Sequence, residues 1–121
     1  MLSLDIQAFT YEDRHDLLPG LTAALGQCGG WILDRRTVSA TQLEFRVEIQ
    51  LRAALELYGA LVEQGLELTR AGHEGLTDLC GRRKHVRHSA ELGQVIAMRL
   101  ELSFLDDVTL HHVLSAGAGA A

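Results

Sequence analysis

The residues best placed to bind a small molecule are the titratable side chains at residues 11–16, Tyr-Glu-Asp-Arg-His-Asp. This run directly precedes leucines at helical spacing, so it lies at the start of an expected helix. A helix N-terminus offers free backbone N–H groups and partial positive charge, and loops in such places often bind ligands. The alternative interpretation is a solvated loop in which Asp13 or Asp16 caps the helix, and the sequence supports both equally.

The strongest concentration of positive charge is RRKHVRH, residues 82–88, which could receive a phosphate or an acidic partner. Because cations are also favoured at a helix C-terminus and the surrounding chain is acidic, we favour a simple helix end. Cys80, His85, His88 and nearby His73 are residue types that bind zinc. Their spacing matches no closed zinc site, and the neighbouring cations would repel a metal ion, so we expect no metal.

The chain has no G-x-S-x-G elbow, Walker loop, G-x-G-x-x-G or C-x-x-C motif, so we expect a non-catalytic protein without a cofactor. A formal net charge of −5 opposes neutralisation of phosphate backbones, so no nucleic-acid partner is expected. No window approaches the roughly 18 apolar residues that cross a bilayer, so no membrane partner is expected either. Two isolated cysteines, Cys28 and Cys80, form no disulfide framework and indicate a reducing, cytoplasmic location.

Hydrophobic periodicity predicts the elements that position these residues. Alternation of apolar and polar residues predicts strands at residues 2–10, 31–38, 42–51, 66–69 and 95–105. Apolar residues at helical spacing predict helices at residues 13–28, 51–62 and 73–83, the first two ending at glycines. The 121 residues, 47% of them hydrophobic, therefore suit one domain at 1–105, with a tail at 106–121 that we expect to be at least partly disordered.

The predicted order is βαββαβ followed by an extra helix and strand, which is typical of an α+β, ferredoxin-like open sandwich. In the strand at residues 42–51, Phe45 belongs to the apolar set, whereas Glu44 and Arg46 point the other way. The sheet should therefore have helices on one face only. We expect the last strand at an edge of the sheet, where it can pair with a second copy, and therefore predict a homodimer.

The string DRHDLLPGLTAALGQCGGWIL, followed by DRRTVS, resembles the first half of an ACT domain, a ferredoxin-like regulatory module that often binds amino acids. The resemblance covers about residues 2–69 and implies assembly side by side. It also implies a non-catalytic role in regulation or in sensing an amino acid or related metabolite. The ligand region that it implies combines the turn after the first strand with the start of the second strand, namely Tyr11, Asp13, Arg14, His15, Asp16, Gly30, Trp31 and Ile32.

The ligand motif is degenerate at three positions. His15 stands where proline is usual in the family, Asp16 where glycine is usual, and Trp31 where asparagine is frequent. An Asp16 carboxylate would repel the carboxylate of an amino acid. These departures favour the alternative function, a structural or protein-interaction module with a non-functional ligand site. An RNA-binding sheet is disfavoured because charged rather than aromatic residues face outward.

Overall fold

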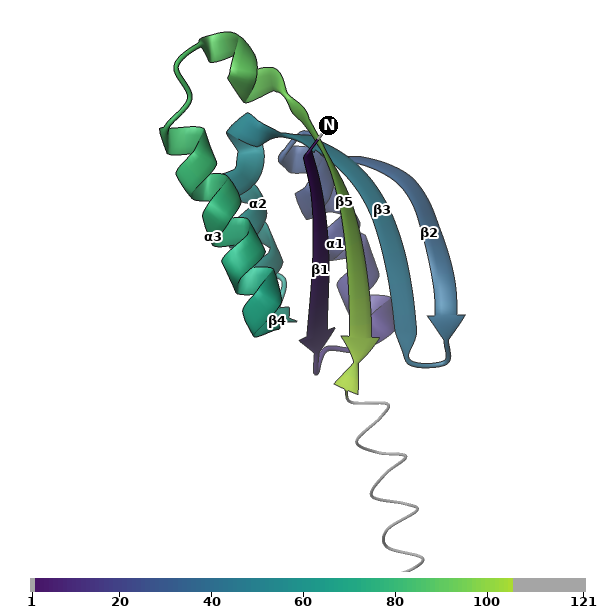
Figure 1. Ribbon diagram of the computed structural model, residues 1–121. Helices are drawn as coiled ribbons and strands as arrows, with labels where there is room; N and C mark the ends of the chain where they lie inside the picture. The colour runs from purple at the N-terminus through teal and green to yellow at the C-terminus, as the bar shows by residue number, and fades with distance from the viewer. Residues whose placement is uncertain (1, 106–121) are drawn as a thin grey trace, which may run out of the picture.

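A five-stranded mixed sheet and three α-helices make up the fold in a computed structural model that describes residues 2–105 (Figure 1). The elements are β1 (Leu2–Thr10), α1 (Arg14–Gln27), β2 (Trp31–Ser39), β3 (Gln42–Gln50), α2 (Ala54–Glu63), β4 (Glu67–Leu68), α3 (Arg70–Lys84) and β5 (Val95–Phe104), with short 3-10 helices η1 (Leu51–Ala53) and η2 (Ser89–Gly93). The predicted α+β class and the order of elements along the chain are confirmed. The expected disorder of residues 106–121 lies outside the described residues.

The strand order β2-β3-β5-β1-β4 puts β5 in the middle of the sheet (Figure 1). It runs parallel to β1 and antiparallel to β3, so both of its backbone edges are paired. The prediction that this strand lies at a sheet edge is therefore wrong, and a ferredoxin-like strand order is not confirmed. The alternation of residues along a strand indicates which face of the strand is buried, but it does not indicate which strands lie beside it.

All three helices cover one face of the sheet (Figure 1). Two glycines let α3 lie close over β1: a Cβ at Gly72 would lie 3.3 Å from Ile6 Cγ2, and one at Gly75 only 2.8 Å from Leu4 Cδ1. Phe45 is 1% exposed beneath the helices, as the alternation predicts. No helix within residues 2–105 is long and apolar enough to span a membrane. The opposite face of the sheet is covered by none of the described helices.

Helices α1 and α2 end in the same hydrogen-bonded motif, which needs a left-handed residue just after the helix. Gly29 has φ +78° after α1, and Gly65 has φ +82° after α2. Beyond Gly29, the N–H of Gly30 donates to the Leu25 carbonyl at 2.8 Å. The predicted glycine stops are confirmed, and the first of them fixes where β2 begins.

The long free edge of the sheet belongs to β2. Both of its faces are largely exposed, with Trp31 at 71%, Leu33 at 55% and Val38 at 46% exposure. The other edge strand, β4, has only two residues. Pairing with β3 shifts register near each end of β2 and is regular over residues 34–37. The edge that a second chain could extend is thus β2 rather than β5.

Candidate functional site

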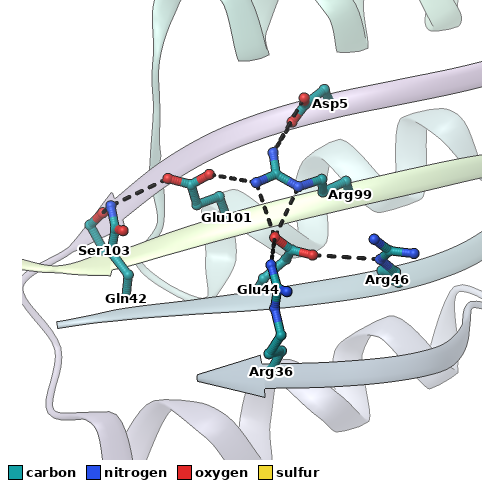
Figure 2. Close-up of polar contacts among 8 residues, drawn as sticks. All are labelled: Asp5, Arg36, Gln42, Glu44, Arg46, Arg99, Glu101 and Ser103. Atoms are coloured by element: carbon teal, nitrogen blue, oxygen red, sulfur yellow. Dashed lines mark hydrogen bonds and ion pairs between the residues drawn. The ribbon is translucent and has the colours of Figure 1, made fainter. Parts of the chain in front are cut away.

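A network of charged side chains lies on the open face of the sheet and joins four neighbouring strands (Figure 2). Its members are Asp5 of β1, Arg99 and Glu101 of β5, Glu44 and Arg46 of β3, and Arg36 of β2. Strand register brings them together, because residues paired across neighbouring strands share a face. The three arginines and three carboxylates cancel to a formal charge of zero.

Glu44 is the centre of the network, and its side chain is only 3% exposed although no described helix lies above it. Arg99 Nε donates to Glu44 Oε2 at 3.0 Å, and Arg36 Nη2 donates to the same oxygen at 3.2 Å. Arg46 Nε lies 3.5 Å from the other oxygen. Burial alone would raise the pKa of Glu44, but the hydrogen bond and charge of Arg99, with help from Arg36 and Arg46, lower it below the ordinary value. The carboxylate is therefore ionised at neutral pH.

Arg99 holds three carboxylates from three strands. Besides Glu44 on β3, its Nη1 donates to Asp5 Oδ1 on β1 at 3.1 Å, and its Nη2 donates to Glu101 Oε2 on β5 at 2.9 Å (Figure 2). The hydrogen bond with Glu44 is the main reason that the pKa of Arg99 is raised above its ordinary value. Arg99 is thus a permanently charged clamp whose donors are already in use.

A hollow of about 400 Å³ lies beside this network on the same face. Ser3 and Ala97 pair across β1 and β5 there, and their small side chains leave room next to the longer Asp5 and Arg99. Leu33 of β2 contributes an apolar wall. The volume of the hollow lies within the range of small-molecule pockets, about 300–1,000 Å³.

The turn between β1 and α1 has clear structural roles. Asp13 Oδ1 accepts a hydrogen bond from the His15 backbone N–H at 2.8 Å, so Asp13 caps α1 as the sequence suggests. Arg14 donates to the Ala40 carbonyl in the β2–β3 turn and lies 4.8 Å over the Phe104 ring. Of these two predicted ligand residues, Asp13 therefore starts the helix and Arg14 ties the turn to the end of the sheet.

The other two acidic residues of that turn, Glu12 and Asp16, border a small cavity of about 220 Å³ between the start of α1 and the end of α2. Its lining includes three carboxylates, from Glu12, Asp16 and Glu63. This concentration of negative charge opposes an anionic ligand. Within residues 2–105, no group of three His, Cys, Asp or Glu side chains has a geometry that could hold a metal ion.

The other predicted ligand residues lie at the far end of α1. Gly30, Trp31 and Ile32 follow the helix, and 14 helical residues span about 21 Å. Trp31 is exposed, whereas Ile32 packs against the core. Within one copy, the two predicted ligand segments are therefore not brought together.

The basic cluster behaves as a helix end in the part of the chain that the structure describes. Arg82, Arg83 and Lys84 occupy the last turn of α3, and His85 follows as its C-cap. Cys28 and Cys80 are both free thiols. Burial, with a smaller contribution from Glu56, raises the pKa of Cys28, so this thiol is protonated at neutral pH.

Sequence reasoning missed the roles of Asp5, Arg99, Glu101 and Arg36, and it treated Glu44 as an ordinary outward residue. Their contacts join positions up to 94 residues apart, and no local motif marks them. The available signal was the recurrence of charged residues at outward positions of several strands. Comparisons with protein-family models, with curated proteins and with solved structures find no match.

Proposed function

We propose that the protein is a non-catalytic, cytoplasmic sensing module of ACT-like type that binds an amino acid or related metabolite as a homodimer. The observation that carries this proposal is the free edge of β2, since the two predicted ligand segments lie at its opposite ends. A two-fold axis through the middle of β2 would place the start of β2 in one copy beside the end of β2 in the other copy. A single copy holds only half of such a site.

The sequence of β2 is self-complementary when two copies pair antiparallel with Arg35 on the axis. Asp34 and Arg36 both lie on the open face, opposite Arg46 and Glu44 of β3. In this register Asp34 of each copy faces Arg36 of the other, which gives two symmetric ion pairs. Either axis places an arginine against itself, but an axis at Arg36 would put Asp34 opposite Val38 and lose both ion pairs, so the register centred on Arg35 is preferred.

The same register joins the two ligand segments. Trp31 of one copy lies opposite Ser39 of the second copy, and Ser39 precedes Ala40, whose carbonyl accepts the hydrogen bond from Arg14. Trp31 therefore approaches the turn that carries Tyr11 in the second copy. An exposed tryptophan beside an exposed tyrosine forms an apolar contact surface suited to a small organic ligand.

The dimer can be tested by light scattering, with an expected mass about twice 13.2 kDa. Asp34→Arg replaces both attractive pairs with repulsive ones, so we expect the dissociation constant of the dimer to rise at least tenfold. Arg35→Thr removes a like-charge contact on the axis worth about 0.2–1 kcal/mol, so we expect a dimer that is tighter by up to about fivefold. The control Arg70→Gln changes an exposed arginine of α3 and should have no effect. A monomeric wild-type chain, or a dimer insensitive to Asp34→Arg, would contradict the arrangement.

Ligand binding is tested separately by thermal-shift screening of amino acids and small metabolites. A ligand at a hundred times its dissociation constant stabilises the protein by about 2.7 kcal/mol. We expect at least one compound to raise the melting temperature of the wild type and to lose most of that effect with Asp34→Arg. The acidic cavity lined by Glu12, Asp16 and Glu63 favours the alternative, a protein-interaction module with a non-functional ligand site. A confirmed dimer that no compound stabilises would support that alternative.

A further inference from the structure

The hollow on the open face of the sheet combines an apolar floor with a charged rim. Ser3 and Ala97 form the low point between the strands, and Leu33, which is 55% exposed, borders it from β2. Leu33 lies where the β2–β3 register shifts, and this irregularity gives β2 an additional residue beside the hollow. Covering such apolar surface removes it from water, which favours binding of an apolar group.

The charge at the rim selects the sign of a ligand. Among the residues that line the hollow, Arg46 and Arg99 are positive and Asp5 is negative, so their net charge is +1. The whole chain, in contrast, has a formal net charge of −5. The rest of the ion network, Arg36, Glu44 and Glu101, brings the formal charge to zero, so an anionic ligand would be attracted by one accessible arginine and not by a net positive charge.

Arg46 is that accessible arginine. Its side chain is 63% exposed, and its one ion pair within the described residues is the 3.5 Å contact with Glu44. If Arg46 turned toward a ligand, Glu44 would keep Arg99 at 3.0 Å and Arg36 at 3.2 Å, so no buried carboxylate would lose its compensation. Turning Arg99 instead would release Asp5 and Glu44 together.

From these contacts we infer that the hollow is a binding site for a small amphipathic monocarboxylate. The ligand's carboxylate pairs with the Arg46 guanidinium, whose planar fork matches two carboxylate oxygens. The apolar part of the ligand covers Ala97 and contacts Leu33. This site lies on the open face of one copy and does not depend on pairing of β2, so it goes beyond the proposed function.

The test is a ¹H–¹⁵N NMR titration of the full chain with sodium hexanoate, hexanamide and hexylammonium chloride. Hexanoate should shift the backbone amides of Leu33 and Ala97 and the Nε–H of Arg46, with a dissociation constant on the order of 1 mM, typical of a ligand this small. Hexanamide has the same apolar body without the charge and should bind at least fivefold more weakly. Hexylammonium, with the opposite charge, should bind more weakly still.

Two variants separate the contributions of charge and shape. Arg46→Gln should weaken hexanoate at least fivefold and leave hexanamide unchanged, whereas Ala97→Leu should fill the hollow and weaken both. The control Arg70→Gln should bind hexanoate like the wild type. The inference is overturned if hexanoate gives no saturable shifts while it remains monomeric in solution, if hexanamide binds equally well, or if Arg46→Gln has no effect. The dimer proposal is tested at Asp34 and Arg35, so either result can fail without the other.

Discussion

The junction between α1 and β2 gives a sharp test of the structure, because adjacent glycines there are required for different reasons. We consider Gly30→Ala first. A Cβ at this position would lie 2.7 Å from the Leu25 carbonyl oxygen and 3.4 Å from Val47 Cγ1. The same Leu25 oxygen accepts the hydrogen bond from the Gly30 N–H that closes the end of α1. The added methyl group therefore meets backbone that is already fixed by the helix.

The cost of this substitution can be worked out from that distance. Ordinary C···O contacts begin near about 3.3 Å, so the Cβ and the Leu25 oxygen must separate by about 0.6 Å. Such a shift strains the hydrogen bond at the helix end, and overpacking of this kind typically costs about 1–3 kcal/mol. In a domain of this size each kcal/mol lowers the melting temperature by about 4–8 °C. We therefore expect Gly30→Ala to melt about 4–24 °C below the wild type.

Two neighbouring glycines serve as matched controls, measured by the same thermal and urea unfolding followed by circular dichroism. Gly29→Ala meets no atom within 4 Å but must keep φ near +78°, which costs about 1–2 kcal/mol. Gly26→Ala lies within α1 with open space around it and should stabilise the protein by about 0.5–1 kcal/mol. If Gly30→Ala melts at or above the melting temperature of the wild type, the close approach of residue 30 to the Leu25 carbonyl oxygen is contradicted.

Three further outcomes follow from burial and charge. Because the folded pKa of Glu44 lies below its unfolded value of about 4.5, the stability it contributes is complete above that pH and is lost as the pH falls toward the folded pKa. Urea unfolding of Glu44→Gln should thus depend less on pH below 4.5 than that of the wild type, and equal slopes would contradict this. Leu100→Ala, at a fully buried position of β5, should lower the free energy of unfolding by about 2–5 kcal/mol. Leu55→Ala, at a position of α2 that is 54% exposed, should change it by less than about 0.5 kcal/mol. Similar losses for the two variants would contradict the assignment of Leu100 to the core. The raised pKa of Cys28 predicts slower alkylation by iodoacetamide at neutral pH than for a free thiol, and rapid reaction would refute it.

Local patterns in the sequence predicted local structure well. The cap at Asp13 and the helix stop at Gly29 depend on neighbouring residues only, and both are confirmed. The alternation of apolar and polar residues around Phe45 correctly predicted which side chains lie on the covered face of the sheet and which lie on the open face. These features were accessible because each is decided within a few residues of chain.

The place of β5 could not be found in the same way. A strand with one covered face has the same alternation in the middle of a sheet as at its edge, so the pattern of Leu100 and its neighbours fits both positions. Close packing of α3 on β1 through Gly72 and Gly75 accompanies the observed arrangement, and it involves residues more than 60 positions apart. The ion network could not be predicted for the same reason, because Arg99 can reach Glu44 only where β5 lies beside β3 in the sheet.

Arg99 secures β5 from the side of the sheet that the helices do not cover. It is paired with Asp5 on the parallel neighbour and with Glu44 on the antiparallel neighbour, while apolar side chains of β5 hold the covered face. A site beside this clamp is built on hydrogen-bonded strands, so binding there requires only the reorientation of Arg46. The ligand site proposed at the turn carrying Tyr11, in contrast, would need a second copy to supply Trp31. Ligand binding at the open face should therefore be independent of protein concentration, whereas binding at the turn should strengthen as the dimer forms.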